Sequence, residues 1–537
     1  MALELTSFYS DFERVPAATE PVAHDARFFF GHAPTWADLG QNYDVARKEN
    51  NRLFKAIDEF FSGSEHRRLL MVSDVSGGGK TTSLRRVAFD LARQGITVLI
   101  CDATGRLEPI QTTKMLENVA GRCVVFVDDF ADQVYSIESI LGILKKTDLM
   151  FVVAERIYRH KFISEVLSDI RFRSERPQQL NVDEAKQLID TYLTVGLVGQ
   201  ANFINDRDGS AHEIAGEPIA VACCRILNDL RPLDRIVESL MIEGTRADRE
   251  RYITCAIAEY CTKGGLRYDI LVNAVSAVGL NTQFNTLHPL PLGFSNDRSN
   301  SFVVPLSGTL GTRICELFAF QSPVEMLKLY INLGKSIAPR VTPIAIRKRS
   351  PEARLSSRLY DLDVAEKFLG ESVEELYLAT EEEWRWNSRY WEQRALLQLY
   401  RSQDENLGFD EIVNSRKLAL AHAKQAVSLE RHPLTLTTLS KILFNEANAI
   451  KANAKSFAEE AIGYLNDAIG QERRRRRLSV QPFMVLFQGL KSLPADVKLS
   501  SATDSIVRAY IVEAAKFFAN DAQVMDLVRE VMKKYRV

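Results

Sequence analysis

Residues 69–92 read LLMVSDVSGGGKTTSLRRVAFDLA, and this stretch decides the fold of the N-terminal half of the chain. An apolar run is followed by three consecutive glycines, by Lys80 and Thr81, and then by an amphipathic pattern. This order predicts a buried strand, a glycine-rich turn and a helix, and such a turn binds phosphate through backbone N–H groups at the helix N-terminus. The residues expected to hold a nucleotide are Ser76, Gly77, Gly78, Gly79, Lys80, Thr81 and Thr82.

One position departs from the phosphate-binding loop (P-loop) pattern G-x-x-x-x-G-K-[ST]. The pattern requires glycine at position 74, and the chain has Asp74 there. Aspartate adopts the backbone angles of such a turn more readily than most residues do, so we expect the turn to form. Its carboxylate would repel phosphate if it pointed inward. The alternative interpretation, a glycine-rich turn with a chance lysine, is opposed by the strand and helix patterns on either side.

Three further apolar runs follow, and segments with helical spacing join each run to the next. The runs are GITVLICDA (95–103), GRCVVFVDDFAD (121–132) and DLMFVVAERIYR (148–159). Near-continuous apolar strands that alternate with helices indicate a parallel sheet covered on both faces. Ligands bind at the carboxyl ends of the strands in such sheets. We therefore expect the loop, Asp128 and Arg156 to meet at that edge.

Two acids follow the apolar run VVFV, a pattern typical of the strand that carries the metal-binding acid of a nucleotide site. We expect Thr81 and Asp128 to bind Mg²⁺, and Asp129 to polarise the attacking water. Arg156, at the end of the next strand, is predicted to sense the γ-phosphate. The alternative for Arg156 is an ordinary strand-end arginine paired with Glu155.

The rest of the chain has mostly helical patterns. Within 182–235, Gly216 and Pro218 interrupt the spacing, and Pro218 is expected to pack against an adenine ring, with a simple helix break as the alternative. Residues 246–320 have the outline of a winged helix, for which we favour intramolecular packing over DNA reading because its expected second helix (266–279) has few basic residues. From about residue 360, amphipathic segments indicate a degenerate tetratricopeptide-like array.

Composition excludes several classes of protein. The chain has 537 residues, of which 46% are apolar and 26% charged, as in soluble globular proteins of several domains. A formal net charge of −2 gives no overall attraction to nucleic acid or to anionic membranes. Seven cysteines without a C-x-x-C pair oppose a zinc site or disulfide framework. Neither a signal peptide nor a long apolar run is evident, so we expect a cytoplasmic protein.

With the P-loop, VVFVDDF, VVAER and GEP in this order, the chain resembles the STAND-type P-loop NTPases. It resembles most the novel STAND group found in bacterial antiviral defence proteins, where this unit often follows a sirtuin-like NAD-consuming domain. Three more segments resemble signatures of the group, so that the likeness covers about residues 25–470. They are FFFGHAPTWADL (28–39), APRVTPIAIRKRSPEARLSSRLYDLD (338–363) and WNSRYWEQRALL (386–397).

The resemblance implies a multidomain α/β plus α protein in five parts. These are an N-terminal segment (1–43), a P-loop NTPase core (44–181), a helical lid (182–245), a winged-helix-like domain (246–335) and a C-terminal helical repeat-like sensor domain (336–537). Two departures accompany Asp74. VPLSGTLGTRICE (304–316) lacks the histidine that some relatives use to hold ADP, and we expect no effector domain before residue 25.

The function implied is a switch that binds ATP or ADP with Mg²⁺, hydrolyses slowly and assembles into homo- or hetero-oligomers. We expect a separate effector protein, such as a sirtuin-like NADase or a nuclease, and a foreign protein as the trigger, with no membrane and no nucleic acid partner. Two alternatives stay open: a nucleotide-stabilised scaffold that does not hydrolyse, and a DNA-binding winged-helix regulator.

Two features of the C-terminal region bear on partners. Trp384, Trp386 and Trp391 lie in one short segment, and we expect them to be interface anchors. The alternative for all three is a core position that joins the array to the switch, and we favour the core position for Trp391. Arg473–Arg477 is an uninterrupted basic run, which we interpret as a solvated helix end in preference to a nucleic-acid site.

Overall fold

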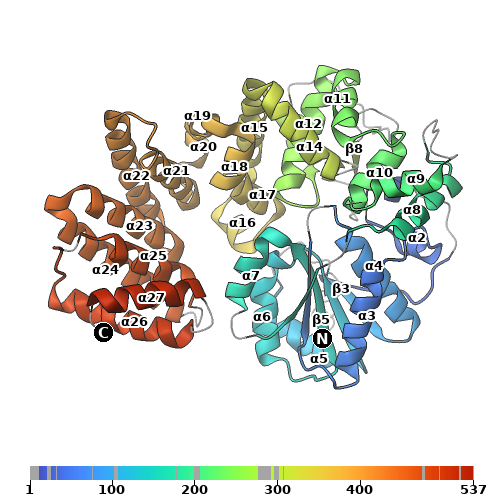
Figure 1. Cartoon of the computed structure of the whole chain (residues 1–537), viewed down its shortest axis with the longest axis horizontal. Helices are drawn as coiled ribbons and strands as arrows, with labels where there is room; N and C mark the ends of the chain where they lie inside the picture. The colour runs from blue at the N-terminus through green and yellow to red at the C-terminus, as the bar shows by residue number, and fades with distance from the viewer. Residues whose placement is uncertain are drawn as a thin grey trace. The chain divides into compact units, whose positions relative to one another are not determined.

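The computed structural model divides the chain into two compact units, an N-terminal unit (Met1–Arg358) and a C-terminal unit (Leu359–Val537). Figure 1 shows the helices and strands of both. The residues that the structure describes are 11–20, 26–31, 33–74, 77–101, 107–167, 170–176, 179–198, 206–275, 292–294, 302–305, 308–474, 478–494, 496–518 and 522–535.

A six-stranded sheet organises the N-terminal unit. In the order in which they pair, its strands are β1 (Phe12–Arg14), β3 (Thr97–Cys101), β4 (Cys123–Val127), β5 (Leu149–Arg156), β2 (Leu69–Asp74) and β6 (Arg173–Glu175). Strand β1 is antiparallel to β3, and the other neighbours pair in parallel. The four apolar runs are therefore strands of one parallel sheet, as predicted, and the strand of the P-loop lies inside the sheet next to β5.

The sheet is buried on both faces because successive side chains of a strand point to opposite sides. Leu69 and Met71 belong to the apolar core on one face, whereas Leu70 and Val72 belong to the core on the other. The first core is completed by α5 (Pro109–Glu117), α6 (Val134–Ile143) and α7 (His160–Val166). The second is completed by α2 (Trp36–Gly40), α3 (Lys48–Phe61) and α4 (Lys80–Arg93).

Four helices follow the sheet, and the first three of them share one apolar core. They are α8 (Val182–Thr194), α9 (Arg207–Ile214), α10 (Ile219–Leu227) and α11 (Leu233–Glu243). Phe29, from the N-terminal segment, packs into this core, and its carbonyl accepts a hydrogen bond from the Tyr192 hydroxyl at 2.6 Å. Gly216, with φ +85°, and Pro218 lie between α9 and α10, so the interruption expected from the sequence is a helix boundary.

A small antiparallel sheet comes next, with the order β7 (Leu266–Arg267), β9 (Phe302–Pro305) and β8 (Leu292–Phe294). The helices of this region are α12 (Arg246–Cys261), α13 (Tyr268–Ala274) and α14 (Gly308–Gln321). The helix expected over 266–279 begins only at Tyr268, because the two residues before it pair with β9. The polar segment NDRSN (296–300), between β8 and β9 in the chain, lies outside the described residues. Helices α15 (Pro323–Ile337), α16 (Pro343–Lys348) and α17 (Pro351–Leu359) complete the unit.

The described part of the C-terminal unit contains helices and no strand. Its α-helices are α18 (Leu362–Leu369), α19 (Val373–Ala379), α20 (Glu381–Trp384), α21 (Ser388–Arg401), α22 (Phe409–Leu429), α23 (Pro433–Ala449), α24 (Ala454–Arg474), α25 (Val480–Ser492), α26 (Ser501–Phe517) and α27 (Ala522–Tyr535). Helices that follow one another in the chain pack together, as α21 does with α22 and α23 with α24. The helical array is thus confirmed, whereas its likeness to tetratricopeptide repeats stays a prediction.

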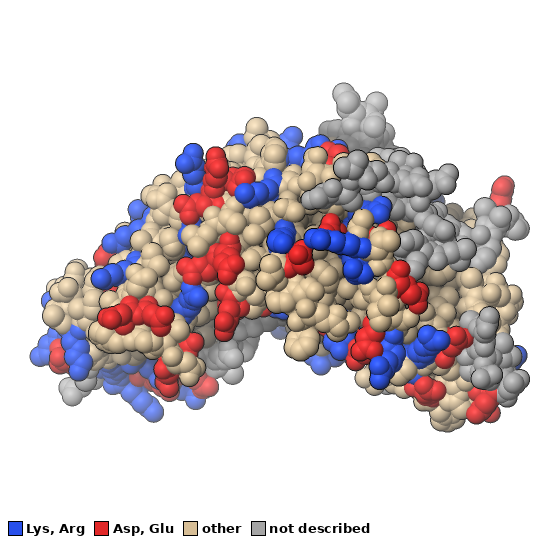
Figure 2. All heavy atoms as spheres, turned by 90° about the horizontal axis from the view of Figure 1, so that it is seen from above, with Lys and Arg blue, Asp and Glu red and all other residues tan. Residues whose placement is uncertain are grey.

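Two properties of the whole molecule bear on its environment. Basic and acidic side chains lie interspersed on the face seen in Figure 2, in keeping with the near-zero net charge. Throughout the part of the chain that is described, no helix is both long and apolar enough to span a bilayer.

Candidate functional site

The glycine-rich loop has the geometry of an anion cradle. Gly77 and Gly79 have φ values of +76° and +91°, a region that side chains disfavour, and Gly79 is the N-cap of α4. No side chain caps this helix, so its first N–H groups and the positive end of its dipole favour an anion. Lys80, Thr81 and Thr82 form the first turn of α4, as expected. Ser76 lies outside the described residues.

Two later helices touch the loop at its glycines. The N–H of Ala220, in the first turn of α10, donates to the carbonyl of Gly77 at 3.0 Å. A Cβ atom at Gly77 would collide with the Thr309 hydroxyl at the start of α14. Pro218, which was predicted to contact adenine, is the N-cap of α10. It lies two residues before Ala220, whose N–H binds the loop. The glycines thus allow α10 and α14 to approach the loop closely, in addition to allowing unusual backbone angles.

Asp74 points toward the loop. A Cβ atom at Gly78 would collide with its carboxylate, which therefore lies directly against the loop backbone. The Lys80 ammonium donates to the Asp74 carbonyl at 3.2 Å. Only 6% of Lys80 is exposed, and this burial lowers the pKa of Lys80 below its ordinary value. The inward carboxylate opposes phosphate binding, whereas the buried ammonium favours it.

Arg47, which sequence reasoning missed, binds the backbone of the loop. The guanidinium of Arg47, the N-cap of α3, donates to the carbonyl of Gly78 at 2.9 Å and lies 3.3 Å from the Glu49 carboxylate. Glu49 in turn accepts a 2.7 Å hydrogen bond from the Ser83 hydroxyl of α4. All three side chains are buried. No local motif marks Arg47, because its role depends on how α3 packs against α4.

The metal-binding pair predicted from the sequence meets in the structure. The Thr81 hydroxyl donates to Asp128 Oδ2 at 2.5 Å, although 47 positions separate the two residues. Asp129 follows with φ +48°, and its N–H donates to the other Asp128 oxygen at 3.0 Å. Burial alone would raise the pKa of Asp128, but the charge of Lys263 and the Thr81 hydroxyl outweigh it, so the pKa lies below its ordinary value. Hydroxyl and carboxylate oxygens are ligands that Mg²⁺ prefers.

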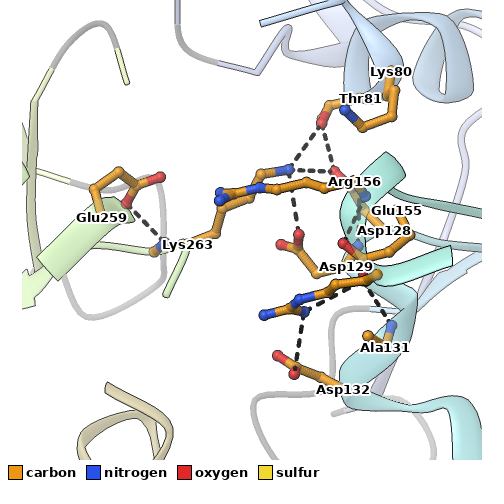
Figure 3. Close-up of polar contacts among 12 residues, drawn as sticks. Lys80, Thr81, Asp128, Asp129, Ala131, Asp132, Glu155, Arg156, Glu259 and Lys263 are labelled. Atoms are coloured by element: carbon orange, nitrogen blue, oxygen red, sulfur yellow. Dashed lines mark hydrogen bonds and ion pairs between the residues drawn. The ribbon is translucent and has the colours of Figure 1, made fainter. Parts of the chain in front are cut away.

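Lys263, which sequence reasoning also missed, contacts this pair from the loop that follows α12 (Figure 3). Its ammonium lies 3.3 Å from Asp128 Oδ2, 3.6 Å from Asp129 Oδ1 and 3.5 Å from the Thr81 hydroxyl oxygen. Burial would lower the pKa of Lys263, yet the two acids outweigh it and raise the pKa above its ordinary value. The lysine is thus held in its charged form.

Arg156 extends from the sheet toward α12, whereas Lys263 extends from the loop after α12 toward the sheet. From the end of β5, its guanidinium donates to the Tyr260 carbonyl in the last turn of α12 at 3.4 Å. The guanidinium beside the Glu155 carboxylate, at 3.4 Å, belongs instead to Arg159. Glu155 accepts N–H bonds from Ala131 at 2.8 Å and from Arg156 at 2.7 Å, and burial raises the pKa of its carboxyl. The side chain of Arg156 is therefore directed toward α12, beyond the sheet.

A second basic cluster binds the turn after the two acids. Asp132 ends the short helix η2 (Phe130–Asp132), and its carboxylate lies 2.8 Å from Arg354 and 3.8 Å from Arg159. Arg349 donates to the Asp132 backbone carbonyl at 2.9 Å. The segment RKRSPEAR (347–354), whose chemistry its sequence does not reveal, is therefore attached to the turn that begins at Asp129.

These groups fit a magnesium-bound nucleotide: an uncapped helix N-terminus, a buried lysine, and a hydroxyl beside a carboxylate. Together with the parallel sheet they define a P-loop nucleotide-binding protein. Residues 26–163 match the family described as Novel STAND NTPase 5. Over these residues the match supports an assignment to the novel STAND NTPases, and it confirms the resemblance inferred from the motifs.

Other comparisons add little. No curated protein sequence matches the chain. The structure of C. elegans PCH-2 is similar at 11% identity and a TM-score of 0.26, over 38% of this chain and 66% of that one. A structure titled as the basis for katanin self-assembly is similar at 15% identity and the same TM-score, over 46% of this chain and 80% of that one. Likenesses this weak carry no inference about function.

Proposed function

We propose that this chain is a molecular switch of a bacterial antiviral defence or signalling system that binds ATP or ADP with Mg²⁺. The supporting observation is the convergence of Thr81, Asp128 and Lys263, because it joins the P-loop to elements beyond the sheet. A ligand shifts a switch only if its affinity differs between two states. A γ-phosphate with its metal, close to Lys80, Asp128 and Arg156, supplies such a difference.

Each residue has one role in this proposal. Lys80 binds the β- and γ-phosphates, Thr81 and Asp128 hold Mg²⁺, Asp129 orients a water molecule, and Arg156 senses the γ-phosphate. The metal would supply positive charge that offsets the charge developing on the transferred phosphate. We interpret the β7–β9–β8 sheet with α12 and α14 as a winged helix that packs within the chain.

Coupling to the remainder of the chain would run through η2. Asp129 begins this turn and Asp132 ends it, so a change at Asp129 reaches Arg354 on α17. The C-terminal helices would recognise a foreign protein, and a separate effector would supply the output.

The nucleotide assignment is tested by Lys80→Ala in calorimetric titrations of MgATP and MgADP. Losing a charge-assisted contact of about 1.5–3 kcal/mol should weaken affinity about 10- to 150-fold. The control is Lys328→Ala on α15, which removes an exposed lysine that pairs with Glu325 at 3.2 Å. Equal affinity of wild type and Lys80→Ala would refute nucleotide binding by this loop.

Hydrolysis of ATP is a separate step from its binding. The inward carboxylate of Asp74 favours the alternative of a scaffold that binds a nucleotide without hydrolysing it. Asp128→Ala should abolish metal-dependent binding of the γ-phosphate. Asp129→Ala should retain bound ATP and lose turnover, because positioning water is its proposed role. Wild-type turnover in Asp129→Ala would exclude that role, and absence of turnover in the wild type with its partners present would favour the scaffold.

Substitution of the basic run at 473–477 tests whether the C-terminal helices bind a protein partner and not nucleic acid. Arg473 pairs with Glu513 at 2.7 Å, and positions 475–477 lie outside the described residues. Replacing all five arginines with serine should leave both defence function and partner pull-down intact. Loss of duplex binding together with loss of function, while partner binding persists, would overturn the protein-partner proposal.

A further inference from the structure

The ammonium of Lys263 lies where the proposed function requires a metal ion. Its three oxygen neighbours belong to Thr81, Asp128 and Asp129, at 3.5, 3.3 and 3.6 Å. Two of these residues are the proposed Mg²⁺ ligands, and the third is the proposed water-orienting acid. Figure 3 shows the side chain reaching across to them from the far side of the site. One positive charge thus bridges oxygens that a divalent cation would otherwise draw together.

The loop that carries Lys263 is firmly attached to its own domain. The Glu259 carboxylate of α12 accepts the N–H groups of Gly264 at 3.1 Å and Gly265 at 2.9 Å. Gly264 and Gly265 have φ values of +103° and +81°, and a Cβ atom at Gly265 would collide with the backbone of Val303 in β9. A displacement of Lys263 therefore moves the end of α12 and the small sheet with it.

We propose that Lys263 is an internal competitor of the divalent cation, and that its contact with the two acids holds the α12 domain against the nucleotide core. This inference rests on the proposed function, because it takes Thr81 and Asp128 as metal ligands. A metal ion and the ammonium cannot both occupy the space between the same oxygens, since like charges a few ångströms apart repel strongly. Metal binding therefore releases Lys263 and frees the end of α12.

The direct test measures Mn²⁺ binding to the full chain without nucleotide, from the electron paramagnetic resonance signal of free Mn²⁺. Lys263→Met keeps the length of the side chain and removes its charge, so affinity for Mn²⁺ should rise about five- to tenfold, the equivalent of a partly exposed ion pair. Lys263→Arg retains the charge and should bind Mn²⁺ like the wild type. Lys328→Met is the matched control, because its lysine pairs with Glu325 outside the site.

A second measurement follows acetylation of the Lys263 ammonium by mass spectrometry, because the proposed release breaks its contacts with Asp128 and Asp129. In the wild type Lys263 should react slowly without metal and faster when Mn²⁺ is added. Lys328, whose contact with Glu325 lies outside the site, should react at the same rate under both conditions. A Lys263 rate that does not change with Mn²⁺ would overturn the release of Lys263.

Asp128→Asn separates this inference from the proposed function. Loss of Mn²⁺ binding in Asp128→Asn, with unchanged or weaker binding in Lys263→Met, overturns the competitor role alone. Unchanged Mn²⁺ binding in Asp128→Asn refutes the metal site on which the proposed function depends. If Lys263→Met weakens MgATP binding and leaves Mn²⁺ binding unchanged, Lys263 is a phosphate ligand and the inference also fails.

Discussion

The nucleotide site of the N-terminal unit and the aromatic core of the C-terminal unit are built in opposite ways. At the site, Asp128 is bound by Thr81 and by Lys263, which lie 47 and 135 positions away in the chain. In the C-terminal unit, the rings of Tyr360, Tyr390 and Trp384 come from one short segment, and Tyr360 lies 4.9 Å from Trp384 and 5.5 Å from Tyr390 between ring centroids.

This difference separates two kinds of stabilisation. The site depends on charges whose balance a ligand can change, because a metal ion or a phosphate alters every ion pair around Asp128. The aromatic core depends on shape and apolar area, which no ligand charge alters. Substitutions at the site should therefore change binding more than stability, and substitutions in the aromatic core should do the reverse.

The largest effect is expected for Trp384→Ala. This side chain is 1% exposed, and its truncation should lower the free energy of unfolding of the C-terminal unit by about 3–5 kcal/mol. Trp386→Ala is the matched control, because Trp386 is 37% exposed and its loss should cost no more than about 0.5 kcal/mol. Urea denaturation followed by near-ultraviolet circular dichroism measures both. A change in MgADP affinity in Trp384→Ala would show that the aromatic core and the nucleotide site do not act independently.

Asp132→Asn should have an intermediate effect. It removes the charge that binds Arg354 and Arg159 while keeping the size of the side chain. Because these side chains are about a quarter exposed, the loss should be about 1–2 kcal/mol, between the values for surface and buried pairs. Chemical denaturation of the N-terminal unit measures this loss. A loss confined to the C-terminal unit would contradict the attachment of residues 347–354 to the turn.

Asp74→Asn should change binding and leave stability nearly unaltered. It removes a negative charge that lies against the P-loop backbone, so MgATP should bind about three- to fivefold more tightly, which corresponds to about 1 kcal/mol. Calorimetric titration measures the change. Weaker binding would mean that the carboxylate supports the loop, and that its inward direction does not oppose phosphate.

The smallest effect at neutral pH concerns His422, because its contribution to the stability of the C-terminal unit changes only as the pH falls below about 6.5. Burial, followed by the charge of Arg394, lowers the pKa of His422 from 6.5 to about 4. Between these values the unfolded chain binds a proton that the folded protein does not, so the free energy of unfolding falls as the pH drops from 6.5 to 4. His422→Gln should flatten that slope, as measured by denaturation at several pH values. An unchanged slope would show that His422 titrates normally in the folded unit.

The interface role that was expected for the tryptophans depends on exposure, which their sequence pattern does not reveal. Trp384 is buried and so is a core residue, not an anchor. Trp391 is half-buried, with its ring 5.2 Å from His422 and its indole N–H bonded to the Arg385 carbonyl. Trp386 alone of the three is exposed enough to meet a partner. The same helical pattern is compatible with all three positions, so only the packing of α20 and α21 separates them.

The sequence by itself determined the strands of the parallel sheet, the P-loop and the pairing of Thr81 with Asp128, because each depends on local periodicity or on a short motif at a strand end. The tertiary structure alone decided the strand order, the inward direction of Asp74 and the contacts of Lys263 and Arg47. The chain has 68 lysines and arginines, and no local pattern distinguishes the few that reach the site. Their roles arise where distant elements pack together and bring opposite charges within a few ångströms.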